Sequence, residues 1–304
     1  MKLSMIRQRC LGDEFAMFKQ LKASGFDGID LSMEPFFDRG SDFLGGIDNW
    51  TDEAIKDYFT DLKEKADSVG IKIFQIHSAF DGHPRYYSSE EEIIKRIECS
   101  IKACHYLGSQ HCVTHPIIDV RRKYDVMEEE TFPAVIDLYK KLIPCLEEYD
   151  VYCCIENMWN VDTVFGHICP TIFSRAKEMV KACELLGDRF KICVDVGHGL
   201  LTQDDPVEMV RICGDKLVCL HVHDNDGLCD LHTIPFAHRQ APEGMVWKPL
   251  AMDWTALMKA LKEIGYKGVL NFEVVIPGPK EIVPAGMDYL AAVGRYLSDI
   301  YENA

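Results

Sequence analysis

Short apolar runs alternate with longer amphipathic segments along the whole chain, and this alternation limits the fold more than any other feature. The runs are nearly continuous in apolar residues, which is typical of parallel strands that are buried on both faces. We predict eight strands, at Lys2–Ile6, Phe26–Leu31, Ile71–His77, His111–His115, Tyr152–Glu156, Lys191–Asp195, Leu217–His221 and Gly268–Glu273.

The segments between these runs carry apolar residues at helical spacing, and most of them stop at a glycine. The predicted helices are Phe15–Ser24, Thr51–Val69, Ile94–Leu107, Phe132–Tyr149, Ala176–Leu186 and Trp254–Ile264. A glycine at the end of a helix favours a left-handed C-cap before the chain turns back. Repeated βα units without a change in composition predict an α/β fold, a single (β/α)8 TIM barrel domain over residues 1–304, rather than a doubly wound sheet.

The charge balance argues against some classes of partner. Lysine and arginine number 33 and aspartate and glutamate 49, which gives a formal charge of −16. Such a chain without a basic stripe repels phosphate backbones, so we expect no nucleic-acid partner. No apolar stretch approaches the roughly 20 residues that cross a bilayer, and the N-terminus does not look like a signal peptide. We therefore expect a cytoplasmic protein with no membrane partner.

The thirteen cysteines contain no CxxC pair. This count therefore supports neither a zinc ribbon nor a thioredoxin-like motif. In a reducing compartment, cysteines inside apolar runs behave as small hydrophobic residues. We expect no structural disulfide and no thiol among the metal ligands.

Side chains that can bind a metal ion stand at or just after the ends of the predicted strands. They are His77, His115, Glu156, Asp195, His198, His221, Asp230, His232 and Glu273. The ends of parallel strands meet at one mouth of a barrel, where active sites lie. Carboxylates that close together repel one another unless a proton or a cation lies between them. Mixed carboxylate and imidazole groups predict a site for a divalent ion such as Mn²⁺, Zn²⁺, Co²⁺ or Fe²⁺ rather than Ca²⁺.

Six motifs resemble those of the xylose isomerase-like TIM barrels, a family of sugar and sugar-phosphate isomerases and epimerases, inosose-type dehydratases and endonuclease IV. They are Ile76-His77-Ser78-Ala79-Phe80, Thr114-His115-Pro116, Ile155-Glu156-Asn157, Val194-Asp195-Val196-Gly197-His198, His221-Val222-His223-Asp224-Asn225-Asp226 and Asn271-Phe272-Glu273. The resemblance covers the whole chain. It implies one divalent metal ion, Mn²⁺ or Zn²⁺ first and Co²⁺, Fe²⁺ or Mg²⁺ as alternatives. The implied ligands are Glu156, Asp195, His221 and Glu273, and the pattern His-x-x-acid-Asn selects His221 over His223.

The resemblance also implies a reaction, in which a sugar, sugar phosphate or polyol is isomerised or epimerised by proton transfer through a metal-stabilised enediolate. Glu156 and Glu273 would be the acid and base, and His198 would hydrogen-bond a substrate oxygen. Sugar rings pack on aromatic side chains, which makes Phe80 and Trp159 candidates for the pocket. The remaining candidate substrate contacts are His77, His115, Asp230, His232 and Arg239. Relatives are often dimers or tetramers, so the resemblance leaves a homo-oligomer open.

Two features depart from the ketose 3-epimerase pattern. The arginine that follows the seventh-strand histidine in those enzymes is absent, and Asn225-Asp226-Gly227 stands there instead. Arg239 is a candidate substitute, within a connection of about 30 residues, Asp224 to Asp253, which we expect to set substrate choice. The histidines and Asp230 also match the pattern with which endonuclease IV holds three zinc ions. The alternatives are therefore an inosose dehydratase-like enzyme or a glycoside-cleaving lyase, and then a metal-dependent phosphodiesterase.

Overall fold

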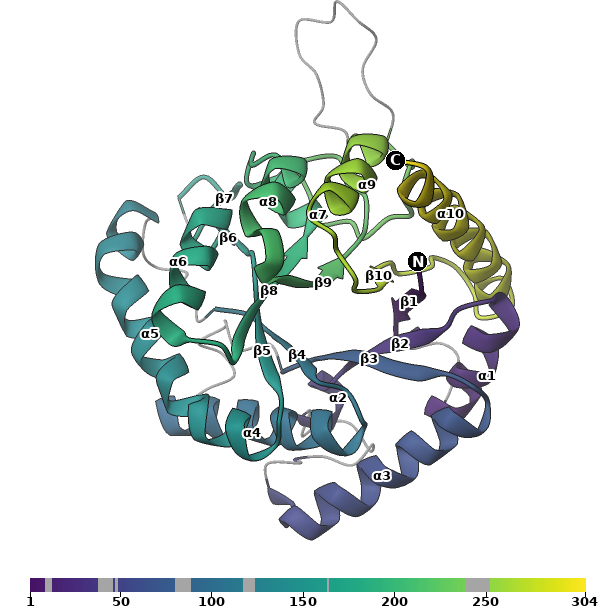
Figure 1. Ribbon diagram of the computed structural model, residues 1–304, viewed down its shortest axis with the longest axis horizontal. Coiled ribbons are helices and arrows are strands. Elements are labelled where there is room, and N and C mark those ends of the chain that lie inside the picture. The colour runs from purple at the N-terminus through teal and green to yellow at the C-terminus, as the bar shows by residue number, and fades with distance from the viewer. Residues whose placement is uncertain are drawn as a thin grey trace, which may run out of the picture.

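The computed structural model has the predicted architecture, a (β/α)8 TIM barrel with helices around a ring of parallel strands (Figure 1). The structure describes residues 1–8, 13–37, 46, 49–79, 89–116, 124–162, 164–238 and 252–304, with the backbone alone over 124–130. The eight-stranded sheet has the order β10-β1-β2-β3-β4-β5-β8-β9. Its strands are β1 (Leu3–Ile6), β2 (Gly28–Ser32), β3 (Lys72–His77), β4 (His111–Thr114), β5 (Tyr152–Glu156), β8 (Phe190–Asp195), β9 (Leu217–His221) and β10 (Leu270–Phe272).

The two end strands of this order meet and close the ring. Val222, just after β9, forms an isolated parallel bridge with Phe272 of β10. Its backbone N–H donates to the Asn271 carbonyl at 2.8 Å, and its carbonyl accepts from the Glu273 N–H at 3.1 Å. We call this bridge the seam of the ring. It lies next to two predicted metal ligands, because Val222 follows His221 and Phe272 precedes Glu273.

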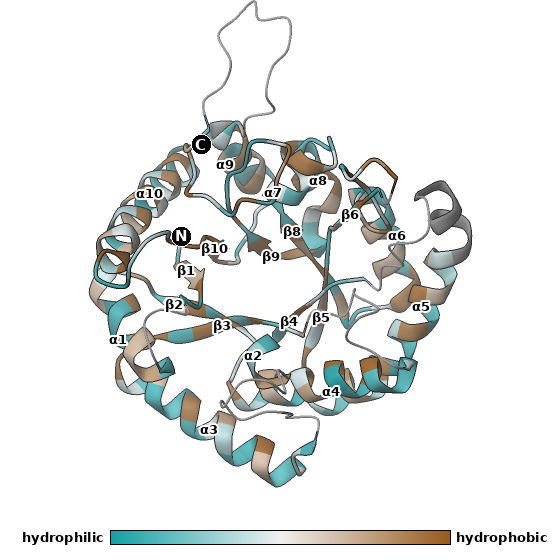
Figure 2. Cartoon of the chain, turned by 180° about the vertical axis from the view of Figure 1, so that it is seen from behind, coloured by the Kyte–Doolittle hydropathy of each residue, from teal (hydrophilic) through white to brown (hydrophobic). Residues whose placement is uncertain are grey.

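The helices pack their apolar sides against the outside of the barrel, and their polar sides face outward (Figure 2). They are α1 (Glu14–Ser24), α2 (Glu34–Phe37), α3 (Asp52–Ser68), α4 (Glu90–Tyr106), α5 (Tyr124–Glu148), α6 (Ala176–Leu186), α7 (Val196–Leu201), α8 (Pro206–Cys213), α9 (Trp254–Glu263) and α10 (Val283–Asn303). Gly25 ends α1 in the left-handed region, with φ 90° and ψ 23°, as the sequence predicted. None of the helices in the described part of the chain is long and apolar enough to span a membrane.

A second, smaller cluster of buried residues lies inside the ring. Val113, Cys154, Cys193 and Cys219 pack together there, and the Sγ atoms of Cys154 and Cys219 are 3.7 Å apart. Side chains alternate along a strand, so each of these cysteines lies two residues below a strand-end carboxylate or histidine. The cysteines fill the barrel as small apolar groups beneath the strand ends.

Several boundaries differ from the sequence prediction. Helix α5 begins at Tyr124, ahead of the predicted Phe132, because the proline that follows Phe132 lies within the helix instead of marking its start. An antiparallel hairpin of β6 (Trp159–Val161) and β7 (Ile168–Pro170) follows β5. We did not predict it, since strands of three residues carry no periodicity that the sequence reveals.

Candidate metal centre

Four predicted ligands meet at the carboxyl end of the barrel. Glu156, Asp195 and His221 are the last residues of β5, β8 and β9 and are fully buried, and Glu273 follows β10. Each of the four offers one ligand atom, and these atoms all lie within 4.8 Å of one another. Strand direction alone brings them together, although they are more than 100 positions apart in the sequence from first to last.

The imidazole of His221 lies at the middle of this group. Its Nδ1 is 2.8 Å from Glu156 Oε1, 3.1 Å from Glu273 Oε2 and 3.9 Å from Asp195 Oδ2. Glu273 Oε2 is buried and accepts no hydrogen bond, despite its closeness to this nitrogen. One ring nitrogen therefore faces three carboxylates.

Asp195 is held in place by its own local structure. It is both the last residue of β8 and the N-cap of α7, where its Oδ1 accepts from the His198 N–H at 2.7 Å. Asn157 pairs with its backbone, accepting from the Asp195 N–H at 2.7 Å and donating to its carbonyl at 2.8 Å. Gly197 is required between these residues, because a Cβ there would lie 2.0 Å from the His223 ring.

Two further groups with the composition of metal sites flank the first. His77 and His115 lie 3.2 Å and 3.1 Å from Glu156 Oε2 and form one group with it. The other group comprises His198, His223, Asp230 and His232. Glu156 thus belongs both to the four-ligand group and to the group with His77 and His115. The group that contains His223 contacts the four-ligand group where His223 Nε2 lies 3.0 Å from Asp195 Oδ1.

Histidines are the only cationic partners of these carboxylates among the described residues. Burial raises the pKa of Glu156, but the nearby His221 and His115 outweigh it and hold this pKa well below its usual range. Burial lowers the pKa of His77, but its hydrogen bond to Glu156 outweighs burial and raises the pKa to about 9. The pKa of His232 is raised to about 9 against burial by its hydrogen bond to Asp230.

The donor set fits a divalent metal ion. Three carboxylates and one imidazole supply the oxygen and nitrogen ligands that Mn²⁺ and Zn²⁺ take in proteins. Oε2 of Glu273 is buried with no hydrogen-bond donor among the described residues, and a cation beside it would offset the cost of burying it. The residues that would hold the ion are Glu156, Asp195, His221 and Glu273.

The structure also places the predicted substrate contacts. Trp159 lies at the site, with its ring centroid 6.4 Å from that of His198. Asp230 and His232, from the long connection after β9, are joined at 3.1 Å and reach the same mouth. Phe80 and Arg239 lie outside the described residues, as do residues 239–251 of the connection.

Two residues of this region were not singled out from the sequence. Asp30 of β2 is fully buried, and its Oδ2 lies 3.1 Å from His221 Nε2. The signal was an aspartate inside an apolar strand. The sequence pattern favoured His221 over His223 as a ligand, yet His223 belongs to the group that also contains His198, Asp230 and His232. Its Nδ1 is buried and has no hydrogen-bond partner among the described residues.

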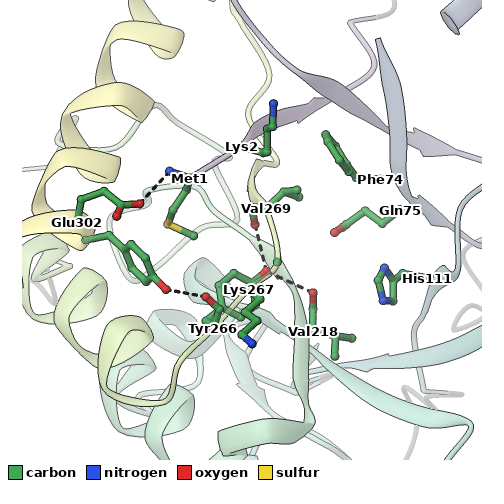
Figure 3. A pocket seen from close by; sticks show the side chains of 12 residues that line it. Met1, Lys2, Phe74, Gln75, His111, Val218, Tyr266, Lys267, Val269 and Glu302 are labelled. Carbon is green, nitrogen blue, oxygen red and sulfur yellow. Dashed lines mark hydrogen bonds and ion pairs between the residues drawn. The ribbon is translucent and has the colours of Figure 1, made fainter. Parts of the chain in front are cut away.

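A pocket of about 430 Å³ lies at the other end of the strands (Figure 3). Lys2, His111 and Gly268, which precede or begin strands, line it together with Gln75 and Tyr266. Its position at the amino ends of the strands separates it from the metal-binding groups, and this end of such barrels serves stability rather than catalysis.

Comparison with known proteins agrees with the fold. Residues 18–293 match the family model described as "Xylose isomerase-like TIM barrel". The inosose isomerase of Bacillus velezensis is 24% identical over 229 residues, which cover 74% of this chain and 75% of that protein. The uncharacterized protein y4fM of Sinorhizobium fredii is 26% identical over 176 residues, 55% of this chain and 48% of that protein, so the chain spans about half the length of this relative.

Solved structures share the fold. The IolI protein with a bound zinc atom has a TM-score of 0.70 and 19% identity, with 100% of this chain and 99% of that chain covered. D-psicose 3-epimerase from Clostridium cellulolyticum, solved with D-tagatose, has a TM-score of 0.69 and 15% identity, with 98% and 99% covered. The family model matches far more than half of the sequence, and this chain therefore belongs to the xylose isomerase-like TIM barrel family.

Proposed function

We propose that this protein is a metal-dependent isomerase or epimerase of a small carbohydrate or polyol. The observation that carries the proposal is the group of Glu156, Asp195, His221 and Glu273, whose ligand atoms lie within 4.8 Å of one another at the carboxyl end of the barrel. When bound there, a divalent ion supplies Lewis-acid stabilisation of the charge that develops on a substrate carbonyl oxygen.

The two glutamates carry the proton. One of them, Glu156 or Glu273, takes a proton from the carbon beside the carbonyl, and the other returns a proton to the opposite face of that carbon. The pKa values of both are lowered, against burial, chiefly by the charge of His221. Both are therefore ionised at neutral pH, which is the form that accepts a proton.

The substrate class follows from this chemistry and from the relatives. Proton transfer of this kind requires a ketone with a hydroxyl-bearing carbon next to it. Inososes and ketoses both have this unit, and they are the compounds after which the isomerase from Bacillus velezensis and the epimerase from Clostridium cellulolyticum are named. The half-buried Trp159 offers an aromatic face for the sugar ring at the same mouth.

A phosphodiesterase is the second candidate, because two further groups of metal-binding composition flank the first. It is the weaker one, since a chain with a formal charge of −16 is poorly suited to a polyanionic substrate.

The test is turnover in deuterated water. The protein, loaded with Mn²⁺, Zn²⁺ or Co²⁺, is incubated with a panel of ketoses and inososes, and in parallel with DNA that contains abasic sites. We expect a metal-dependent product with solvent deuterium on the isomerised or epimerised carbon. Cleavage of the DNA without turnover of any sugar, or a product formed by intramolecular hydride shift, would overturn the proposal.

A further inference from the structure

We propose that Asp30 is a positioning residue, which holds His221 so that Nδ1, and not Nε2, binds the metal ion. This inference rests on the metal site of the proposed function. It concerns a residue on β2, a strand that contributes none of the proposed ligands.

The geometry around His221 divides its two ring nitrogens between two environments. Nδ1 faces Glu156 Oε1 at 2.8 Å and Glu273 Oε2 at 3.1 Å. Nε2 points the other way and lies 3.1 Å from Asp30 Oδ2. An ionised carboxylate accepts hydrogen bonds but cannot donate them, so Nε2 donates to Asp30 and keeps its hydrogen. Nδ1 is then the nitrogen that would give up its proton to bind an ion between Glu156 and Glu273.

Asp30 is itself fixed from three directions. Its Oδ2 accepts from Gln75 Nε2 of β3 at 2.8 Å and from Asn271 Nδ2 of β10 at 3.0 Å, in addition to His221. All four side chains are buried. Because donors from three strands converge on Oδ2, this oxygen is held in one position. That position determines the orientation of the imidazole plane of His221.

Among the described residues, His221 is the ionisable partner of Asp30. Gln75 and Asn271 are neutral amides, and among the described residues no lysine or arginine pairs with Asp30. Burying a carboxylate is costly unless it is paired, and His221 is the partner here. A metal ion on Nδ1 makes the Nε2–H a stronger donor, so the ion and the Asp30 charge stabilise one another through the ring.

Gln75 links this network to the opposite end of the barrel. It lines the pocket at the amino ends of the strands, where Figure 3 shows it opposite Tyr266 and Val218. The side chains of Gln75 and Asp30 are 1% and 0% exposed, so neither is open to solvent. The network is therefore an internal support for the metal site, closed off from the solvent on the far side.

The test compares metal affinity in matched variants. Asp30→Asn keeps the shape and an acceptor for Nε2 but removes the charge. Gln75→Met is the control, because it removes a donor to the same oxygen and leaves the contact between Asp30 and His221 in place. We expect Asp30→Asn to weaken the binding of Zn²⁺ and Co²⁺ by about 10- to 100-fold and to change the visible spectrum of bound Co²⁺. Gln75→Met should weaken binding by less than about threefold, below the usual range for a direct partner of a ligand.

Equal loss of affinity in the two variants, or none in Asp30→Asn, would overturn the inference. Thermal unfolding of the metal-free forms separates a loss of affinity from a loss of fold. A measurement on the unchanged protein covers the case in which Asp30→Asn does not fold. With ¹⁵N-labelled histidine and ¹¹³Cd²⁺, we expect cadmium coupling to Nδ1 of His221 and a retained hydrogen on Nε2, and coupling to Nε2 would contradict the assignment.

These measurements use metal ions and no substrate, so they can be told apart from the test of the proposed function. A chain that turns over no sugar but shows the expected loss of affinity keeps the role of Asp30 and loses the isomerase. If the unchanged protein turns over sugars but Asp30→Asn binds metal normally, the isomerase proposal stands and the role of Asp30 is lost.

Discussion

The indole of Trp159 donates a hydrogen bond from Nε1 to Asp230 Oδ2 at 3.3 Å. This contact joins hairpin β6–β7 to the connection after β9, two segments that are about 70 positions apart. One side of the indole is thereby fixed at the mouth of the barrel, beside the ring of His198.

Substitution of Trp159 should affect substrate binding more than turnover. Trp159→Ala removes the aromatic face, and we expect KM to rise about 10-fold, the upper range for an aromatic contact. Trp159→Phe keeps a ring and loses only the bond to Asp230, so its KM should rise less. The control is Trp254→Phe, since Trp254 is 3% exposed and packs in the core; this change should lower Tm and leave KM unchanged. Equal KM values in all three variants would show that Trp159 does not contact the substrate.

Metal content should depend on the charge of Asp195. Asp195→Asn keeps an oxygen that can cap α7, and we expect it to lower metal affinity by more than about 100-fold, because it weakens a direct ligand. Asp205→Asn is the control: Asp205 caps α8 in the same way, accepting from the Val207 N–H at 2.9 Å, but lies away from the site. Elemental analysis should give about one ion per chain in the unchanged protein. Three tightly held ions per chain would contradict the single-metal prediction.

Each glutamate of the proposed acid–base pair should be needed for turnover. Glu156→Gln and Glu273→Gln keep the side-chain shape and remove the base, so we expect kcat to fall by about 100-fold or more. Glu184→Gln, on the exposed side of α6, should have no effect. Metal content must be measured for each variant, because both glutamates are also proposed ligands. A variant that retains its metal and full turnover would exclude that glutamate from proton transfer.

The metal-free protein should lose stability as the pH rises. His77 and His232 have pKa values of about 9 in the folded protein against an ordinary 6.5. A raised folded pKa gives stability that is fully present below pH 6.5 and is lost as the pH rises through 9. We expect Tm of the chelator-treated protein to fall by several degrees over this range, and His232→Asn to fall less steeply. A Tm that rises or stays constant would contradict these pairings.

The fold and the convergence of the strand-end side chains follow from patterns that are local in the sequence, whereas the choice of four ligands among them came from the resemblance to a family. Apolar runs and glycines at the ends of helices predicted the barrel. The shared direction of parallel strands then predicted that Glu156, Asp195 and His221 would lie together at one end of it. These three side chains are the last residues of their strands in the structure. The role of each in binding or catalysis stays a prediction.

The support for the site could not be predicted in the same way. Asp30 and His221 are 191 positions apart, and Asp30 and Asn271 are 241 apart, so their contacts depend on barrel closure and register. Hairpin β6–β7 and helix α7 were missed for a local reason. The strands have three residues each, and α7 begins directly at the residue after β8, with no connecting turn to mark it.

The seam at Val222 gives the proposed metal ion a mechanical role. Within the described chain, β9 and β10 pair through a single bridge between Val222 and Phe272, and the flanking His221 and Glu273 stand on either side of it. An ion that binds both side chains would link β9 to β10 where the strands of the ring have the fewest paired residues. Removing it would let the barrel open there first, and amide hydrogens at Val222 and Glu273 would exchange with solvent ahead of those on the other strands.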